Sequence, residues 1–125
     1  MSTAILPVTN GVRWVTSGDL VDDNITASEK EVIEVLGYRA MRLTLRVWSI
    51  KANTSAPVFA LVMDTGMNAD DPASFVCLGA FDSLTSAPTV VQRVFTDLQR
   101  YVRWRVLIFN NIDDAQFSIE GVVYE

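Results

Sequence analysis

A period of two runs through the hydrophobic residues of this chain and leaves little choice of secondary structure. In the stretch RAMRLTLRVWSIK (39–51), one parity carries Met41, Leu43, Leu45 and Val47. The other parity carries Ala40, Arg42, Thr44, Arg46 and Trp48. Successive side chains of a β-strand point to opposite faces of a sheet. The stretch therefore predicts a half-buried strand with an apolar inner face and a cationic, aromatic outer face.

Five further segments between residues 57 and 124 have the composition of strands. Residues 57–65 and 74–81 are apolar on both parities, which indicates strands that are covered on both sides. Gly79, inside the second of these, indicates a bulge or a close backbone approach. The remaining three segments alternate, and they comprise residues 88–95, 100–110 and 115–124. Short polar turn sequences separate all of them.

The N-terminal part of the chain adds weaker strand signals. Residues 31–36 predict a seventh strand, and ILPV (5–8) and VRWVT (12–16) predict one or two edge strands. Residues 28–36 are the only candidate helix, but their β-branched residues favour a strand. Regularly spaced short strands without helices between them predict an all-β, antiparallel two-sheet β-sandwich of jelly-roll type with about eight strands.

The length of 125 residues corresponds to one domain. Residues 26–125 are expected to form the sandwich, and residues 1–25 an N-terminal arm with the edge strands. The start of the chain lacks a basic segment followed by a long apolar stretch, which predicts neither a secretory signal nor a membrane span.

Arginine is concentrated in two of the predicted strands. Eight of the ten basic residues are arginines, and the segments 39–51 and 100–110 hold most of them. If these two strands are neighbours, their outer faces form one patch of guanidinium and aromatic groups. The candidate interface residues are Arg42, Arg46, Trp48, Tyr101, Arg103 and Arg105. Arginine combined with tryptophan or tyrosine is typical of protein-protein hot spots.

Two other interpretations of these arginines stay open. They could be solvated outer-face residues that pair with acids on adjoining strands, such as Glu120 or Asp64. They could also bind nucleic acid or a sulfated glycan. A net charge of −5 argues against general nucleic-acid binding, for which a basic surface is expected.

Several classes of catalytic site are excluded by composition. The chain has no histidine, so Ser-His and Cys-His arrangements cannot form, and the commonest zinc ligand is missing. The single cysteine, Cys77, lies between Val76 and Leu78 and is expected to be a buried, inert thiol. No phosphate-binding glycine loop is present. We expect no enzymatic activity and no cofactor.

Carboxylate pairs occur in turn-like stretches, where aspartate usually caps the local backbone. They are Asp22-Asp23, Asp70-Asp71 and Asp113-Asp114. The loop DTGMNADDP (64–72) is the best metal candidate, since Asp64, Asp70 and Asp71 could supply oxygen ligands for calcium. The loop lacks the spacing of an EF-hand, so a plain acidic hairpin loop is expected and no metal site is assigned.

Residues 57–125 contain three motifs that resemble small β-sandwich proteins of tailed bacteriophages. The family pattern W-x-x-L-G-x-F corresponds to FVCLGAF (75–81), with Phe75 where the family often has tryptophan. The segment from Phe95 to Trp104 resembles the pattern F-x-x-L-x-R-Y-V-R-V-R-W in part, with Leu98, Arg100, Tyr101, Val102 and Arg103 in place. The segment from Phe117 to Gly121 resembles the closing F-x-F/S-V-x-G strand in part. Discoidin-like carbohydrate-binding sandwiches have similar R-Y-V-R strands.

The resemblance implies a non-enzymatic structural protein of the virion, such as a capsid decoration or head-tail component. Its partners would be copies of itself and other virion proteins, with no direct contact to nucleic acid or membrane, and it would assemble in the host cytoplasm. The alternative is a carbohydrate-binding module for host glycans. For that function the candidate aromatic residues are Trp14, Tyr38 and Trp48.

Overall fold

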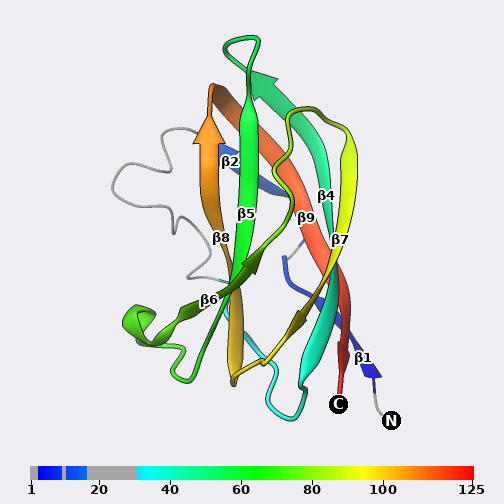
Figure 1. Cartoon of the computed structure of the whole chain (residues 1–125), viewed down its shortest axis with the longest axis vertical. Helices are drawn as coiled ribbons and strands as arrows, with labels where there is room; N and C mark the ends of the chain where they lie inside the picture. Colours follow the sequence, from blue (N-terminus) through cyan, green and yellow to red (C-terminus); the bar gives the residue numbers. More distant parts are fainter. Residues whose placement is uncertain (1–2, 10, 17–30) are drawn as a thin grey trace.

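Two antiparallel β-sheets packed face to face make up the protein (Figure 1). The computed structural model describes residues 3–9, 11–16 and 31–125. Sheet A contains β1 (Thr3–Pro7), β2 (Arg13–Thr16), β4 (Ala40–Ala52), β7 (Thr89–Thr96) and β9 (Ile112–Tyr124). Sheet B contains β3 (Ile33–Glu34), β5 (Val58–Gly66), β6 (Val76–Ala80) and β8 (Tyr101–Asn110). These nine strands confirm the predicted sandwich, with one strand more than the approximate number expected.

The strand order defines which residues can meet. Sheet A runs β1-β9-β4-β7, and β2 also pairs with β9 beyond the end of β1. Sheet B runs β3-β8-β5-β6. One short 3₁₀ turn, η3 (Pro72–Ser74), precedes β6. No helix in the described ranges is long and apolar enough to cross a membrane.

The core lies between the sheets and is filled by one parity of each long strand. β4 contributes the four apolar residues that its alternation predicts, all of them buried: Met41, Leu43, Leu45 and Val47. The opposite sheet contributes Phe59 from β5 and Trp104 from β8, and both rings pack against Phe117 of β9. Large aromatic side chains that meet at the centre dominate the apolar area removed from water.

The two segments that are apolar on both parities differ in their positions. β5 lies between β8 and β6 and is buried almost throughout, as predicted. β6 pairs only with β5 and is an edge strand, with Val76 and Cys77 exposed. The prediction of a buried thiol was wrong, because Cys77 lies opposite Asp64 and so points to the outer side of sheet B.

The prediction for Gly79 is confirmed. The register of β5 and β6 shifts beside this residue, between Met63 and Asp64. A Cβ atom at position 79 would lie 2.8 Å from Nη2 of Arg93. Glycine therefore leaves the space through which the Arg93 side chain crosses from β7 to β6.

The N-terminal strands β1 and β2 lie at the edge of sheet A, as predicted, and both pair with β9. The seventh predicted strand, residues 31–36, is reduced to the two residues of β3, which pair with Tyr101 and Val102. The predicted boundary between residues 25 and 26 and the pair Asp22-Asp23 lie outside the described residues.

Candidate functional site

The two arginine-rich strands do not lie side by side. β4 lies in sheet A between β9 and β7, whereas β8 lies in sheet B between β3 and β5. The two strands therefore turn their outer faces in opposite directions, and the predicted single patch does not exist. The six candidate interface residues divide into two groups: Arg42, Arg46 and Trp48 on sheet A, and Tyr101, Arg103 and Arg105 on sheet B.

The β8 arginines form an ion-pair cluster with Asp64 of the adjoining strand β5. Oδ2 of Asp64 accepts hydrogen bonds from Nε of Arg103 at 3.2 Å and from Nε of Arg105 at 3.0 Å. Nη2 of Arg105 donates to Oδ1 at 3.3 Å. The Arg103 and Asp64 side chains are only 4% and 3% exposed, and that of Arg105 is 21% exposed.

Aromatic packing completes the burial of this cluster. The Arg103 guanidinium lies 4.2 Å from the ring centroid of Phe75, which follows η3. Tyr101 is half-buried, and the Arg100 guanidinium lies 5.2 Å from its ring centroid. Arg103 is thus a residue of the fold and not of an exposed contact surface. The interpretation that arginines pair with acids on adjoining strands is correct for Asp64.

The outer face of sheet A is different, because its arginines remain in contact with solvent. Arg42 and Arg46 are exposed, and within the described ranges no ion pair includes either of them. Glu120, the other acid considered from the sequence, lies opposite Thr44 and forms no ion pair with these arginines.

Apolar residues lie beside both of these arginines. Arg42 lies between Val94 of β7 and Val122 of β9, and Val122 in turn lies opposite Ile5 of β1. Arg46 lies between Val90 of β7 and Ser118 of β9. Opposite residues in an antiparallel pair share a face. The sheet A face, as we call this surface, comprises Ile5, Trp14, Arg42, Arg46, Trp48, Val90 and Val94.

Trp48 is the aromatic group of the sheet A face that two neighbouring side chains hold in place. A register shift between Val47 and Ser49 places Trp48 at a bulge of β4. Its Nε1 donates to Oγ of Ser118 at 3.2 Å, and the Arg46 guanidinium lies 5.0 Å from its ring centroid. The indole is held by two neighbours and still has 45% of its surface exposed. A preorganised aromatic side chain loses little conformational entropy when it is covered by a partner.

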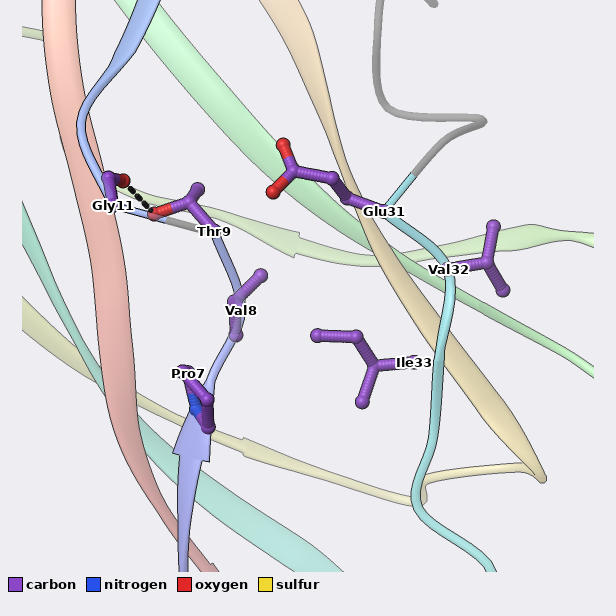
Figure 2. Close-up of a pocket in the computed structure, with 7 residues that line it drawn as sticks. All are labelled: Pro7, Val8, Thr9, Gly11, Glu31, Val32 and Ile33. Atoms are coloured by element: carbon purple, nitrogen blue, oxygen red, sulfur yellow. Dashed lines mark hydrogen bonds between the residues drawn. The ribbon is translucent and has the colours of Figure 1, made fainter.

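A hollow between the sheets lies beside β3 (Figure 2). It has a volume of about 410 Å³ and is lined by Pro7, Val8, Thr9, Gly11, Glu31, Val32 and Ile33. Oε1 of Glu31 accepts hydrogen bonds from Nε1 of Trp104 at 3.0 Å and from Nε of Arg13 at 2.6 Å. This buried carboxylate therefore orients the central indole of the core.

Glu31 was not predicted as a site or core residue. The only signal in the sequence is an acid at the start of an apolar segment, together with a tryptophan on the inner parity of residues 100–110. Neither observation places the two residues together without knowledge of the pairing of β3 with β8.

The acidic loop between β5 and β6 is an ordinary turn in the structure. Asp64 is bound to the arginines, whereas Asp70 and Asp71 are exposed. Oδ1 of Asp71 accepts a hydrogen bond from the backbone N–H of Ala73 at 3.0 Å, which caps η3. Across the described residues no group of three acidic, cysteine or histidine side chains could hold a metal ion. Asp113 and Asp114 lie in β9 and not in a turn.

Comparisons with known proteins place the fold and no more. No protein-family model matches the chain, and no curated protein matches it. The structure of Eiger TNF from S. frugiperda superposes with a TM-score of 0.52 at 12% identity, over 98% of this chain and 91% of that one. Truncated AlyQ, with CBM32 and alginate lyase domains, gives 0.50 at 12% identity, over 99% of this chain and 34% of that one.

A chain of the cyanophage Pam1 capsid asymmetric unit gives a TM-score of 0.47 at 16% identity, over 98% of this chain and 84% of that one. The chain is a small two-sheet β-sandwich, a fold that it shares with Eiger TNF and truncated AlyQ, while carbohydrate-binding modules, adhesin domains and a phage capsid chain superpose on it with TM-scores of 0.46 to 0.49. Folds of this kind carry many functions, so the surface has to indicate the role.

Proposed function

We propose that this chain is a non-enzymatic structural protein of a tailed-phage virion that acts through multivalent protein-protein contacts. The sheet A face is the proposed contact surface. In this role the protein assembles in the host cytoplasm with copies of itself and with a major capsid or head-tail protein. Its position would be that of a capsid decoration or a head-tail component.

The observation that carries the proposal is the set of exposed apolar side chains on the outer face of sheet A. Ile5, Trp14, Trp48, Val90 and Val94 have between 45% and 83% of their surface exposed. They come from four strands that lie side by side or pair with the same strand of sheet A. Exposed apolar patches of this kind usually mark interaction sites, because water contact with them is unfavourable.

The chemistry of the face also describes its partner. Arg42 and Arg46 lack acidic partners within the described residues, so a docked surface that presents carboxylates between apolar residues would match them. Such contacts between charged groups near the surface weaken as salt is added. The resemblance of residues 57–125 to phage sandwiches supports the choice of a virion partner.

A second candidate function is the binding of host glycans, and the arrangement of two tryptophans favours it. Trp14 and Trp48 both project from the sheet A face, and Gln116 and Ser118 lie beside them. Flat aromatic rings next to hydrogen-bonding side chains can hold a sugar ring by stacking. Tyr38 is half-buried against the core and is less suited to this function.

The experiment that tests the proposal compares wild-type protein with Trp48→Ala. Virion particles assembled without this chain are mixed with each protein, separated by sedimentation, and assayed for the bound chain. We expect wild-type protein to bind at saturating copy number, and Trp48→Ala to bind at least about tenfold more weakly, the loss typical of a hot-spot residue.

A glycan array with the same two proteins separates the two candidate functions. Selective glycan binding by wild-type protein that is lost in Trp48→Ala, without particle binding, would replace the assembly proposal with the adhesion function. Cys77→Ser serves as a control, since it changes one exposed residue on the outer side of the other sheet.

A further inference from the structure

Strand β7 leaves one edge of sheet A unpaired. It is eight residues long and pairs only with β4. Within the described part of the chain, no other backbone hydrogen bond involves residues 89–96. Figure 1 shows β7 on the flank of the molecule, at the end of the sheet. A row of unpaired N–H and C=O groups on an edge strand of this length can pair with another strand.

The usual protection of such an edge is only partly present. Arg93 lies opposite Leu43, which is a core residue, so its side chain starts from the inner face of β7. The guanidinium Nη1 donates to the backbone carbonyl of Ala80 at the end of β6. Arg93 therefore closes the gap between the two sheets on the core side. The backbone groups of β7 in the plane of sheet A have no hydrogen-bond partner besides β4 among the described residues.

The sequence of β7 selects one way of pairing with itself. Opposite residues in an antiparallel pair share a face, so a two-fold axis must pass through a residue that meets its own copy. Axes through Gln92 and through Arg93 give the longest overlaps. An axis through Arg93 would place two guanidinium groups opposite each other, which is unfavourable.

An axis through Gln92 gives complementary contacts instead. Val90 then lies opposite Val94 of the second copy, and Val94 opposite Val90 of the second copy. Both valines are more than half exposed in the single chain. Nε2 of Gln92 donates to Oγ1 of Thr44 at 3.0 Å, which leaves its second N–H and its Oε1 for the Gln92 of the second copy at the axis.

From this register we infer that two copies of the chain pair through β7 in antiparallel orientation, with Gln92 on the two-fold axis. The inference deepens the proposed function by naming one of its partners, a second copy, and by giving that contact a surface separate from the rest of the sheet A face. The paired sheets would form one continuous layer. It would present Arg42, Arg46 and Trp48 of both copies on the same side.

The contact is small, since one strand pair covers less than a standard protein interface. The free protein is therefore expected to dimerise weakly and reversibly. On a particle, the two copies are held close together, and the raised effective concentration strengthens the same contact.

A charge exchange at Gln92 tests the inference by sedimentation velocity over a range of concentrations. Wild-type protein should form dimers reversibly, with a midpoint at or below about 1 mM. Gln92→Glu and Gln92→Lys should each dimerise about tenfold or more weakly, because like charges meet at the axis. An equimolar mixture of the two variants should restore the dimer, since opposite charges then face each other.

The matched controls are Gln116→Glu and Gln116→Lys, which make the same changes on β9, away from the β7 edge. They should dimerise like wild type. The inference is overturned if wild-type protein stays monomeric at about 1 mM, if the Gln92 variants dimerise like wild type, or if their mixture does not restore the dimer.

Trp48→Ala, included in the same experiment, keeps this test separate from the proposed function. It should dimerise like wild type while losing binding to particles. If Trp48→Ala loses particle binding but the Gln92 variants dimerise like wild type, only the β7 pairing is refuted. If the Gln92 variants and their mixture behave as expected but Trp48→Ala binds particles like wild type, only the proposed contact surface is refuted.

Discussion

Strands β4 and β8 have similar sequences and very different surroundings. Each carries two arginines on its outer parity with an aromatic residue nearby. On β8 the arginines are bound to Asp64, and Arg103 is almost completely buried. On β4 both arginines remain exposed, and Arg46 contacts only the Trp48 ring among the aromatic and charged groups of the described residues.

The neighbouring strands account for the difference. Arg103 lies directly opposite Asp64 in β5. Arg105 lies opposite Val62, two residues before Asp64 on the same strand, and so reaches the same carboxylate. Arg42 lies between Val94 and Val122, neither of which can neutralise it. A strand pattern thus specifies which side chains point outward. The residues of the adjoining strands decide whether an outward arginine becomes part of the fold or stays available for a partner.

The largest effect that would test this comparison is expected from Asp64→Asn. The change keeps the shape of the side chain but leaves two guanidinium groups, one of them buried, without their counter-charge. We expect the free energy of unfolding to fall by about 3–5 kcal/mol, as for other buried pairs that lose one partner. Urea denaturation measures this difference.

Asp70→Asn is the matched control for that substitution. It makes the same chemical change in the exposed loop before η3 and should stay within about 0.5 kcal/mol of wild type. Equal losses for the two variants would mean that the Asp64 cluster does not stabilise the fold.

An intermediate effect is expected when one arginine is removed from each strand. Arg103→Ala removes a charge-assisted hydrogen bond and the contact with Phe75, but the pair of Asp64 with Arg105 remains. The free energy of unfolding is therefore expected to fall by about 2 kcal/mol. Arg46→Ala should change stability by less than about 0.5 kcal/mol. If thermal and urea unfolding rank the two variants in the opposite order, β4 and β8 do not differ as described.

The smallest effect on stability is expected from Trp14→Ala. The side chain is largely exposed in the edge strand β2, so the free energy of unfolding should change by less than about 0.5 kcal/mol. Particle binding should weaken all the same, because Trp14 belongs to the sheet A face. A Trp14→Ala variant that unfolds much more readily than wild type would place the indole in the fold and remove it from the contact surface.

The fold was predictable because alternation is a local property of the chain. Met41 and Leu43 reach the core because they share a parity, and β5 is covered on both sides because both of its parities are apolar. Pairing between distant segments is not a local property. Without the sheet order, the sequence could not place β4 and β8 in different sheets, expose Cys77 on an edge strand, or bring Glu31 to Trp104.

Strand β9 carries a consequence for how the protein folds. It follows the other eight strands in the chain, yet β1, β2 and β4 all take it as their partner. During synthesis the first two strands must wait until the last one has left the ribosome, and the loops that then close span most of the chain. Folding of sheet A is therefore expected to be slow compared with folding of a single hairpin. A chain whose synthesis stops before β9 would have no partner strand for β1 and β2.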